Sequence, residues 1–305
     1  MITTPAILKA ERSVVDGPIE RIVIKGVSKS FNTRQNKGRR GAAAQPFLAV
    51  RDFSLEVREG EFLSVVGPSG CGKSTLLDLL AGLEAPSGGT IYLDGKPVAG
   101  PNQRVGIVLQ GYALFPWRTV RKNIEFGLEI KEVEKKERLR ISQHYIELVG
   151  LGGFEESYPH ELSGGMRQRV AIARALAYDP EVLLMDEPFA AVDAQTRETL
   201  QEELLSIWER TGKTVVFITH SIDEAIFLSD RIAVMSSSPG SLKSLLEVDL
   251  PRPRKTDRSS VRFGQLRHEI WELIQQNGHG QRQLEEQLVI KEAEELLVIR
   301  TPVRA

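Results

Sequence analysis

The chain has little cysteine and no long apolar run. Cys71 is the single cysteine in 305 residues, so no disulfide can form within the chain, which fits a reducing cytoplasm. No stretch approaches the roughly 18 uninterrupted apolar residues of a membrane-spanning helix. Residues 1–16 contain two acidic residues and no long apolar segment, so we expect no signal peptide there. If the protein acts at a membrane, we expect it to do so through a partner.

A strong charge imbalance is also missing. The 40 Lys and Arg residues are balanced by 41 Asp and Glu residues, which gives a formal net charge of -1. A dedicated nucleic-acid binder needs a basic surface to neutralise phosphates, so we expect no nucleic-acid partner. The 41% of hydrophobic and 27% of charged residues are typical of a globular protein. The length favours one elaborated domain with a tail.

Apolar runs that alternate with helical patterns predict an α/β protein with a largely parallel sheet. We expect helical segments over 120–150 and 194–210. We expect strands over 19–24, 47–57, 61–66, 182–185 and 214–219, and a hairpin turn at Asp94-Gly95. Beyond residue 251 we expect a helix with one apolar stripe that packs on the core, formed by Phe263, Leu266, Ile270, Leu273 and Ile274.

A basic loop interrupts the first part of the chain. Residues 32–45 are rich in Gly, Ala and Arg, and they carry Arg34, Lys37, Arg39 and Arg40. A solvated loop and a contact with anionic lipid are both open interpretations.

A glycine-rich stretch carries the first functional motif. It follows an apolar strand and precedes a helix, which is where a phosphate-binding loop belongs. Backbone N–H groups and the positive end of the helix then favour phosphate. We expect Lys73 to reach the β- and γ-phosphates of ATP and Ser74 to offer its hydroxyl to Mg²⁺. The residues that match G-x-x-x-x-G-K-[ST], and that we expect to bind the nucleotide, are Gly67, Pro68, Ser69, Gly70, Cys71, Gly72, Lys73, Ser74 and Thr75.

Two acidic residues end a second apolar strand. An acid in such a place is costly unless a cation or a donor meets it, so Asp186 is expected to hold Mg²⁺. Glu187 is the candidate that polarises the attacking water.

Cys71 lies near a positive helix end, which predicts a thiol more acidic than usual. We expect alkylating reagents to reach this thiol unless MgATP protects it. The alternative is that Cys71 is merely a small residue that fits the turn.

A further motif indicates the family. Leu162-Ser163-Gly164-Gly165-Met166-Arg167-Gln168-Arg169 resembles the signature of ABC ATPases. The other family motifs follow in order: Gln110 fits the glutamine loop, Ala190-Ala191-Val192-Asp193 the D-loop, His220 the switch histidine and Phe31 the aromatic residue that stacks on adenine. Phe47 follows the basic loop and is the competing candidate for the adenine.

The resemblance covers roughly residues 19–275 and implies a P-loop ABC cassette with an antiparallel β subdomain and a helical signature subdomain at about 113–168. It places the nucleotide-binding domain at 19–250, an N-terminal extension at 1–18 and a tail with a helix at 251–305. Two such subunits pack head-to-tail around two ATP molecules. Ser163, Gly165 and Asp193 are then expected to serve the partner's nucleotide. His220 contacts the γ-phosphate and the water of Glu187, while Lys73 and Gln110 complete the set that supports hydrolysis, with Gln110 also near Mg²⁺.

Within the family, the chain is similar to the ATPases of nitrate, sulfonate and taurine importers. The likeness lies in Gly111-Tyr112-Ala113-Leu114-Phe115-Pro116-Trp117, Ser238-Pro239-Gly240 and Asp249-Leu250-Pro251-Arg252-Pro253-Arg254. It implies a second copy of the chain, a separate transmembrane permease and, indirectly, an extracytoplasmic solute-binding protein as partners, with the chain peripheral on the cytoplasmic face of the cell membrane. Export is the open alternative. One phosphate loop per chain disfavours a soluble ABC ATPase that acts on DNA or ribosomes.

Overall fold

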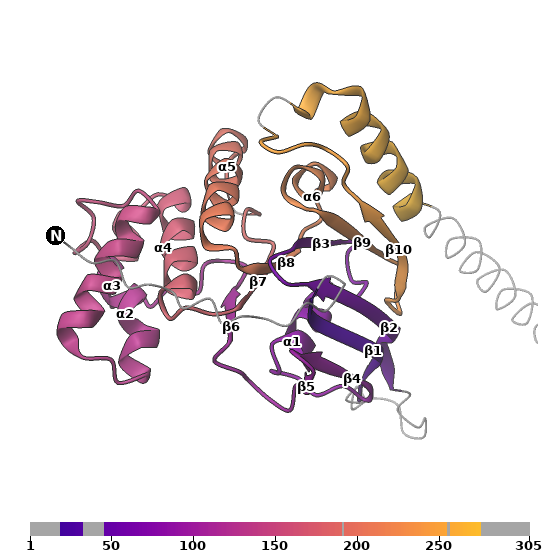
Figure 1. Cartoon of the computed structure of the whole chain (residues 1–305), viewed down its shortest axis with the longest axis horizontal. Helices are drawn as coiled ribbons and strands as arrows, with labels where there is room; N and C mark the ends of the chain where they lie inside the picture. The colour runs from indigo at the N-terminus through magenta and orange to yellow at the C-terminus, as the bar shows by residue number, and fades with distance from the viewer. Residues whose placement is uncertain (1–18, 33–45, 191, 255–256, 276–305) are drawn as a thin grey trace, which may run out of the picture.

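The computed structural model describes residues 19–32, 46–190, 192–254 and 257–275. A six-stranded sheet forms its centre, in the order β10-β9-β3-β8-β7-β6 (Figure 1). Five neighbouring strands are parallel and β10 pairs antiparallel with β9. The strands are β3 (Phe62–Val66), β6 (Val105–Val108), β7 (Val182–Asp186), β8 (Thr214–Ile218), β9 (Arg231–Met235) and β10 (Leu242–Glu247).

The central strands are buried on both faces, because each face packs against a different layer. Alternate residues of β7 show this arrangement. Leu183 and Met185 join the core with α4 (Gly164–Ala177), α5 (Ala194–Thr211) and α6 (Ile222–Leu228). Val182 and Leu184 point to the opposite face, into the core formed with α1 (Lys73–Leu80) and the second sheet.

The second sheet is antiparallel, in the order β2-β1-β4-β5. Its strands are β1 (Glu20–Phe31), β2 (Phe47–Arg58), β4 (Gly88–Leu93) and β5 (Lys96–Pro97). The strand expected over 19–24 continues to Phe31 because a register shift between Ile24 and Val27 accommodates Gly26, at φ 58°. The hairpin turn at Asp94-Gly95 is confirmed, with both residues at positive φ.

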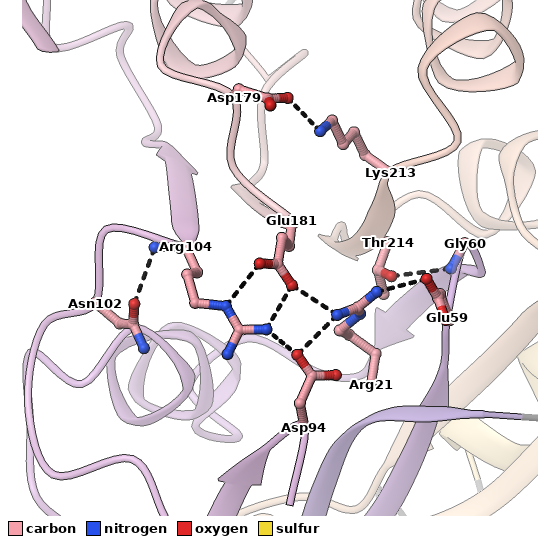
Figure 2. A network of polar contacts seen from close by, with 10 residues as sticks. All are labelled: Arg21, Glu59, Gly60, Asp94, Asn102, Arg104, Asp179, Glu181, Lys213 and Thr214. Atoms are coloured by element: carbon pink, nitrogen blue, oxygen red, sulfur yellow. Dashed lines mark hydrogen bonds and ion pairs between the residues drawn. The ribbon is translucent and has the colours of Figure 1, made fainter. Parts of the chain in front are cut away.

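A network of charges joins the two sheets (Figure 2). Arg21 on β1 contacts Glu59, Asp94 and Glu181, with N–O distances of 2.6–2.7 Å. Arg104, next to β6, bonds both Glu181 and Asp94. The hydrogen bond from Arg104 holds the pKa of Glu181 below its ordinary value. Glu181 directly precedes β7. The network therefore fixes the antiparallel sheet against the end of the central sheet at which β7 begins.

The remaining helices form two groups. α2 (Val120–Ile130), α3 (Lys135–Leu148) and α4 pack together at one side of the central sheet (Figure 1). Short 3-10 turns at Pro159–Glu161 and Asp257–Ser259 lead into α4 and the C-terminal helix. That helix, over 261–275, buries Phe263, Leu266 and Ile270 in the core around α4–α6, as its stripe predicts. Within the described ranges, no helix combines the length and the hydropathy needed to cross a membrane.

Three expectations concern residues outside the described ranges: the N-terminal extension over 1–18, the basic stretch with Arg34, Lys37, Arg39 and Arg40, and the last thirty positions, 276–305.

Candidate nucleotide-binding and hydrolysis site

The phosphate loop connects β3 to α1. β3 is wholly buried, and the loop after it leads into α1 through Gly72, which caps the helix at φ 97°. A Cβ at Gly72 would lie 2.7 Å from the carbonyl oxygen of Ala49, so only glycine fits between α1 and β2. The Nζ of Lys73 lies 2.9 Å from the carbonyl oxygens of Gly67 and Pro68. The expected strand, loop and helix are therefore all present, and the lysine lies within the loop.

Ser74 and Asp186 come together from different elements. Ser74 is exposed in the first turn of α1, and Asp186 ends β7. A hydrogen bond from Ser74 reaches the carboxyl of Asp186, whose pKa is nevertheless raised, chiefly by burial. Asp186 is 9% exposed, and its Oδ1 has no hydrogen-bond partner among the described residues. A buried, unpaired carboxylate oxygen beside a hydroxyl is a donor set that suits a hard divalent cation.

Glu187 and His220 form a pair at the ends of neighbouring parallel strands. Asp186 on β7 pairs with Ile218 on β8, so the residues that follow the two strands emerge side by side. The Nδ1 of His220 lies 3.2 Å from Oε2 of Glu187. Glu187 has φ 42°, a left-handed conformation that costs a residue with a side chain about 1 kcal/mol or more. The strand ends hold the carboxylate of this strained residue in direct contact with the imidazole, so that both side chains can face a water and a phosphate placed beside the pair.

Cys71 does not have the properties expected of it. It is fully buried, and burial raises the pKa of its thiol even though Lys73 lies beside it. The expectation of an unusually acidic thiol was wrong because desolvation exceeds the attraction of the lysine and the helix end. The interpretation of Cys71 as a small residue that fits the turn agrees with its packing, since a Cβ at Gly67 would lie 3.0 Å from its Sγ.

The signature residues are not part of the same constellation. Ser163 caps α4, accepting a hydrogen bond from the backbone N–H of Met166 at 3.3 Å, and it is exposed. α4 packs on the face of the central sheet opposite α1. Gly165 is buried, and a Cβ there would lie 2.7 Å from Cγ2 of Thr196, so the glycine also allows α4 to approach α5. Asp193 is exposed and caps α5 through the N–H of Thr196.

The two aromatic candidates for adenine lie side by side. Phe31 ends β1 and Phe47 begins β2, and the two are directly paired across the antiparallel strands. Paired residues of this kind project on the same side of a sheet. Both are partly exposed, and the Nζ of Lys29 lies 5.0 Å from the centre of the Phe31 ring. The choice between Phe31 and Phe47 therefore stays open, because the two rings belong to one surface.

Gln110 follows β6 and is exposed at the start of a strained segment. Tyr112 and Ala113 have φ of 69° and 46°, and Arg174 of α4 donates to the carbonyl oxygens of both residues. Sequence reasoning missed Arg174. Its signal was a basic residue in the otherwise apolar second half of α4, and its target appears only when α4 packs beside the loop.

Gly240 is a second residue that the sequence marked without giving its role. Its N–H donates to Ala49, and its carbonyl oxygen accepts from Arg51, so β2 holds it on both sides. A Cβ at Gly240 would lie 2.0 Å from the carbonyl oxygen of Cys71. The turn between β9 and β10 therefore packs directly against the phosphate loop, and any side chain at Gly240 would displace the loop.

Comparisons with known proteins agree with this geometry. Residues 50–190 match the family model of ABC transporters. The chain is similar to a nitrate import ATP-binding protein of Synechocystis, with 49% identity over 222 residues that cover 73% of this chain and 82% of the relative. It is also similar to an aliphatic sulfonates import ATP-binding protein of Bacillus cereus, with 44% identity over 257 residues that cover 84% and 97% of the two chains.

A solved structure has the same fold. The chain superposes with a TM-score of 0.64 and 31% identity on an ATP-binding cassette described as the dimeric structure of a post-hydrolysis state bound to ADP and Pi. The match covers 75% of this chain and all of that one. The ABC cassette fold expected from the sequence is confirmed, and so is the expectation that the chain binds ATP. The chain belongs to the ATP-binding proteins, the ATPase subunits, of ABC transporters.

Proposed function

We propose that the chain hydrolyses ATP with the residues assembled at the ends of β3, β7 and β8, and that it thereby powers import of a small solute through a separate permease. The pairing of Glu187 with His220, beside Ser74 and Asp186, is the observation that carries the hydrolytic part. This arrangement places a base, a second polar group and a phosphate-binding helix end at one edge of the sheet.

In this proposal the phosphate loop binds the β- and γ-phosphates through its N–H groups and Lys73. Lys73 exchanges its contacts with the loop carbonyls for contacts with phosphate oxygens. Glu187 orients a water for attack on the γ-phosphorus, and His220, 3.2 Å from Glu187, contacts the same phosphate. Catalysis of this kind depends on positioning and charge stabilisation, so a strained and rigid Glu187 suits its role.

Mg²⁺ is the expected cofactor, and the residues fit it. Ser74 supplies a hydroxyl, Asp186 a buried oxygen without a partner, and Gln110 follows the adjacent β6. When bound, the cation would neutralise charge on the phosphates. For the chain itself, the consequence is that the charge of Asp186 is balanced only in the nucleotide-bound state.

Ser163, Gly165 and Asp193 are proposed to serve the nucleotide of a second copy of the chain. Their place on the face opposite α1 supports a role in trans, because the capped start of α4 is an exposed helix end that can bind a phosphate. The similar cassette of known structure is dimeric. We propose the same head-to-tail dimer here, stabilised by ATP through linkage.

An apolar groove beside the glutamine loop is the proposed permease contact. A cavity of about 500 Å³ lies between α2, α4 and the end of β6. The apolar and aromatic residues that line it are Leu83, Ile107, Leu109, Phe115, Phe126 and Ile130. Exposed apolar side chains around a groove suit an amphipathic helix of a partner. Since Tyr112 and Ala113 form the adjoining strained segment, a helix in this groove would contact the loop that carries Gln110.

The test compares two exposed apolar residues of the helical group. Ile130 is 62% exposed and lines the groove, whereas Leu139 on α3 is 39% exposed and does not. We expect Ile130→Asp to lower the yield of a membrane polypeptide that co-purifies with the tagged chain from solubilised membranes, and to abolish uptake. Leu139→Asp, the control, keeps both, and both variants keep ATP binding. Equal co-purification and uptake by the two variants would place the docking site elsewhere.

The solute is proposed to be a small anion of the nitrate, sulfonate or taurine type. The support is similarity to both a nitrate and an aliphatic sulfonate import ATP-binding protein, at 49% and 44% identity. Uptake of labelled nitrate and of an alkanesulfonate, measured with and without the gene for this chain, distinguishes the solutes. In such a system the chain would lie on the cytoplasmic face of the membrane, held there by the permease, with the solute-binding protein on the far side.

A further inference from the structure

Glu224 is a buried acid that the steps above do not use. It lies in the first turn of α6, four residues after His220, and it is 6% exposed. The hydroxyl of Thr219 donates to its Oε2 at 2.6 Å, and its own backbone N–H donates to Oγ of Ser221 at 3.3 Å. Glu224 therefore holds both residues that flank His220, and it is also close enough to His220 for an electrostatic interaction.

The same carboxylate faces the helix that follows the D-loop. Nε of Arg197 on α5 lies 3.8 Å from Oε1 of Glu224. The other end of that guanidinium donates to the carbonyl oxygen of Val192 at 2.8 Å. Val192 directly precedes Asp193, the D-loop residue that caps α5. Arg197 thus links the D-loop backbone to the carboxylate that holds the His220 segment.

A third contact comes from the side of the C-terminal segment. Gln201 of α5 is 2% exposed and lies close enough to Glu224 for its side chain to help lower the pKa of that acid. Arg258 donates to Oε1 of Gln201 at 2.6 Å. Burial raises the pKa of Glu224, whereas Thr219, Arg197 and Gln201 oppose that rise. A buried acid is costly, and both the segment after β8 and the helix α5 supply polar partners for Glu224.

We propose that Glu224, together with Arg197, is a positioning unit that fixes the switch histidine and the D-loop relative to each other. The inference rests on the proposed roles of His220 and Asp193. If the D-loop moves when the dimer forms, this unit would transmit the movement to His220 through the Arg197–Glu224 ion pair and the hydrogen bond from Thr219 to Glu224. The unit contributes to hydrolysis and not to ATP binding, because Glu224 and Arg197 hold segments that follow β8 and β7, whereas Lys73 and the phosphate loop follow β3.

The experiment measures kcat and KM for MgATP hydrolysis by the full chain and its variants. Glu224→Gln keeps an acceptor for Thr219 but removes the charge that faces Arg197, and Arg197→Met removes the other partner. Each is expected to lower kcat about tenfold and leave KM within about twofold, because a small misplacement of a reacting group can cost up to about 10²-fold. Arg197→Lys, which retains the charge, restores part of kcat.

The double variant shows whether the two residues act as a unit. If they do, Glu224→Gln with Arg197→Met lowers kcat no further than the worse single variant. Asp223→Asn is the matched control, because Asp223 lies in the same turn of α6, has a side chain that is 47% exposed and pairs with Arg267. We expect its kcat within about twofold of the wild type, as for an exposed ion pair. Thermal unfolding of every variant shows which of them are folded.

Three results would overturn the proposal: a kcat near wild type in either single variant, multiplicative losses in the double variant, or an equal loss in Asp223→Asn. If Glu224→Gln does not fold, the variants of the half-exposed Arg197 decide alone: kcat must fall in Arg197→Met and recover in part in Arg197→Lys. His220→Ala separates this inference from the proposed function. Normal turnover in His220→Ala overturns the assignment of the switch histidine itself, whereas inactive His220→Ala with fully active Glu224→Gln overturns the positioning unit alone.

Discussion

Replacing Asp186 by Asn is expected to stabilise the nucleotide-free protein while it removes activity. Asp186 is 9% exposed, and its Oδ1 has no partner within the described part of the chain. A buried carboxylate oxygen without a partner costs about 1–3 kcal/mol or more, because its charge is desolvated, and the neutral amide of Asn removes that charge. Ser74 and Lys73 offset part of that cost. We therefore expect a net gain of about 1 kcal/mol in the free energy of unfolding, or about 2–4 °C in Tm for a chain of this size.

The gain in the free energy of unfolding that Asp186→Asn brings is expected to grow as the pH rises. Burial raises the pKa of Asp186, so the folded protein holds the proton at pH values where the unfolded chain has lost it. The wild type therefore loses stability as the pH rises through the folded-state pKa of this acid. The variant has no such proton. We expect the advantage of Asp186→Asn to be full above the folded-state pKa of Asp186 and to shrink toward pH 4, the ordinary range of an aspartate.

The second half of the assay measures how ATP and Mg²⁺ change the stability of the two proteins. Saturating MgATP stabilises whichever protein binds it, by about 2.7 kcal/mol at a hundredfold excess over Kd. We expect calorimetry to show that wild type gains from Mg²⁺ beyond the gain from ATP alone, and that Asp186→Asn does not. Asp179→Asn is the control, since Asp179 is exposed and paired with Lys213, and its free energy of unfolding is expected to change by no more than about 0.5 kcal/mol. An Asp186→Asn protein no more stable than wild type at pH 7, or one with the full Mg²⁺ response, would refute the reasoning.

Two further substitutions test the site. Glu187→Gln removes the base and is expected to lower turnover about 10²–10⁴-fold while ATP binding persists. It should therefore accumulate an ATP-bound dimer in size-exclusion chromatography, and near-normal ATPase activity would contradict the assignment. Gly240→Ala would bring its Cβ within 2.0 Å of the carbonyl oxygen of Cys71. The resulting shift of the phosphate loop is expected to weaken ATP binding about tenfold in a fluorescence titration, since overpacking costs about 1–3 kcal/mol. Gly264→Ala, where a Cβ meets nothing within 4 Å, is its control, and equal affinities would contradict the support role.

Local sequence predicted the secondary structure where the pattern was local. β7, β8 and α5 agree closely with the apolar runs and the helical stripe, because burial of a run on both sheet faces or one helix face leaves a periodic trace. The thiol of Cys71 shows where such reasoning fails. The helix end is visible in the sequence, but the complete burial that raises the pKa comes from β2 and the turn at Gly240 packing around the loop.

The sequence by itself determined the chemistry of each motif: a lysine and hydroxyl after glycines, two acids after an apolar strand, and a histidine after another. The residues of each motif lie within a few positions of one another, so local spacing alone reveals each motif. Only the tertiary structure decided which of them meet. The parallel pairing of β7 and β8 places Glu187 against His220, and packing on the opposite sheet face separates Ser163 from α1. The buried contacts of Glu224 join segments that follow two different strands, and such contacts arise from long-range packing, which leaves no periodic trace in the chain.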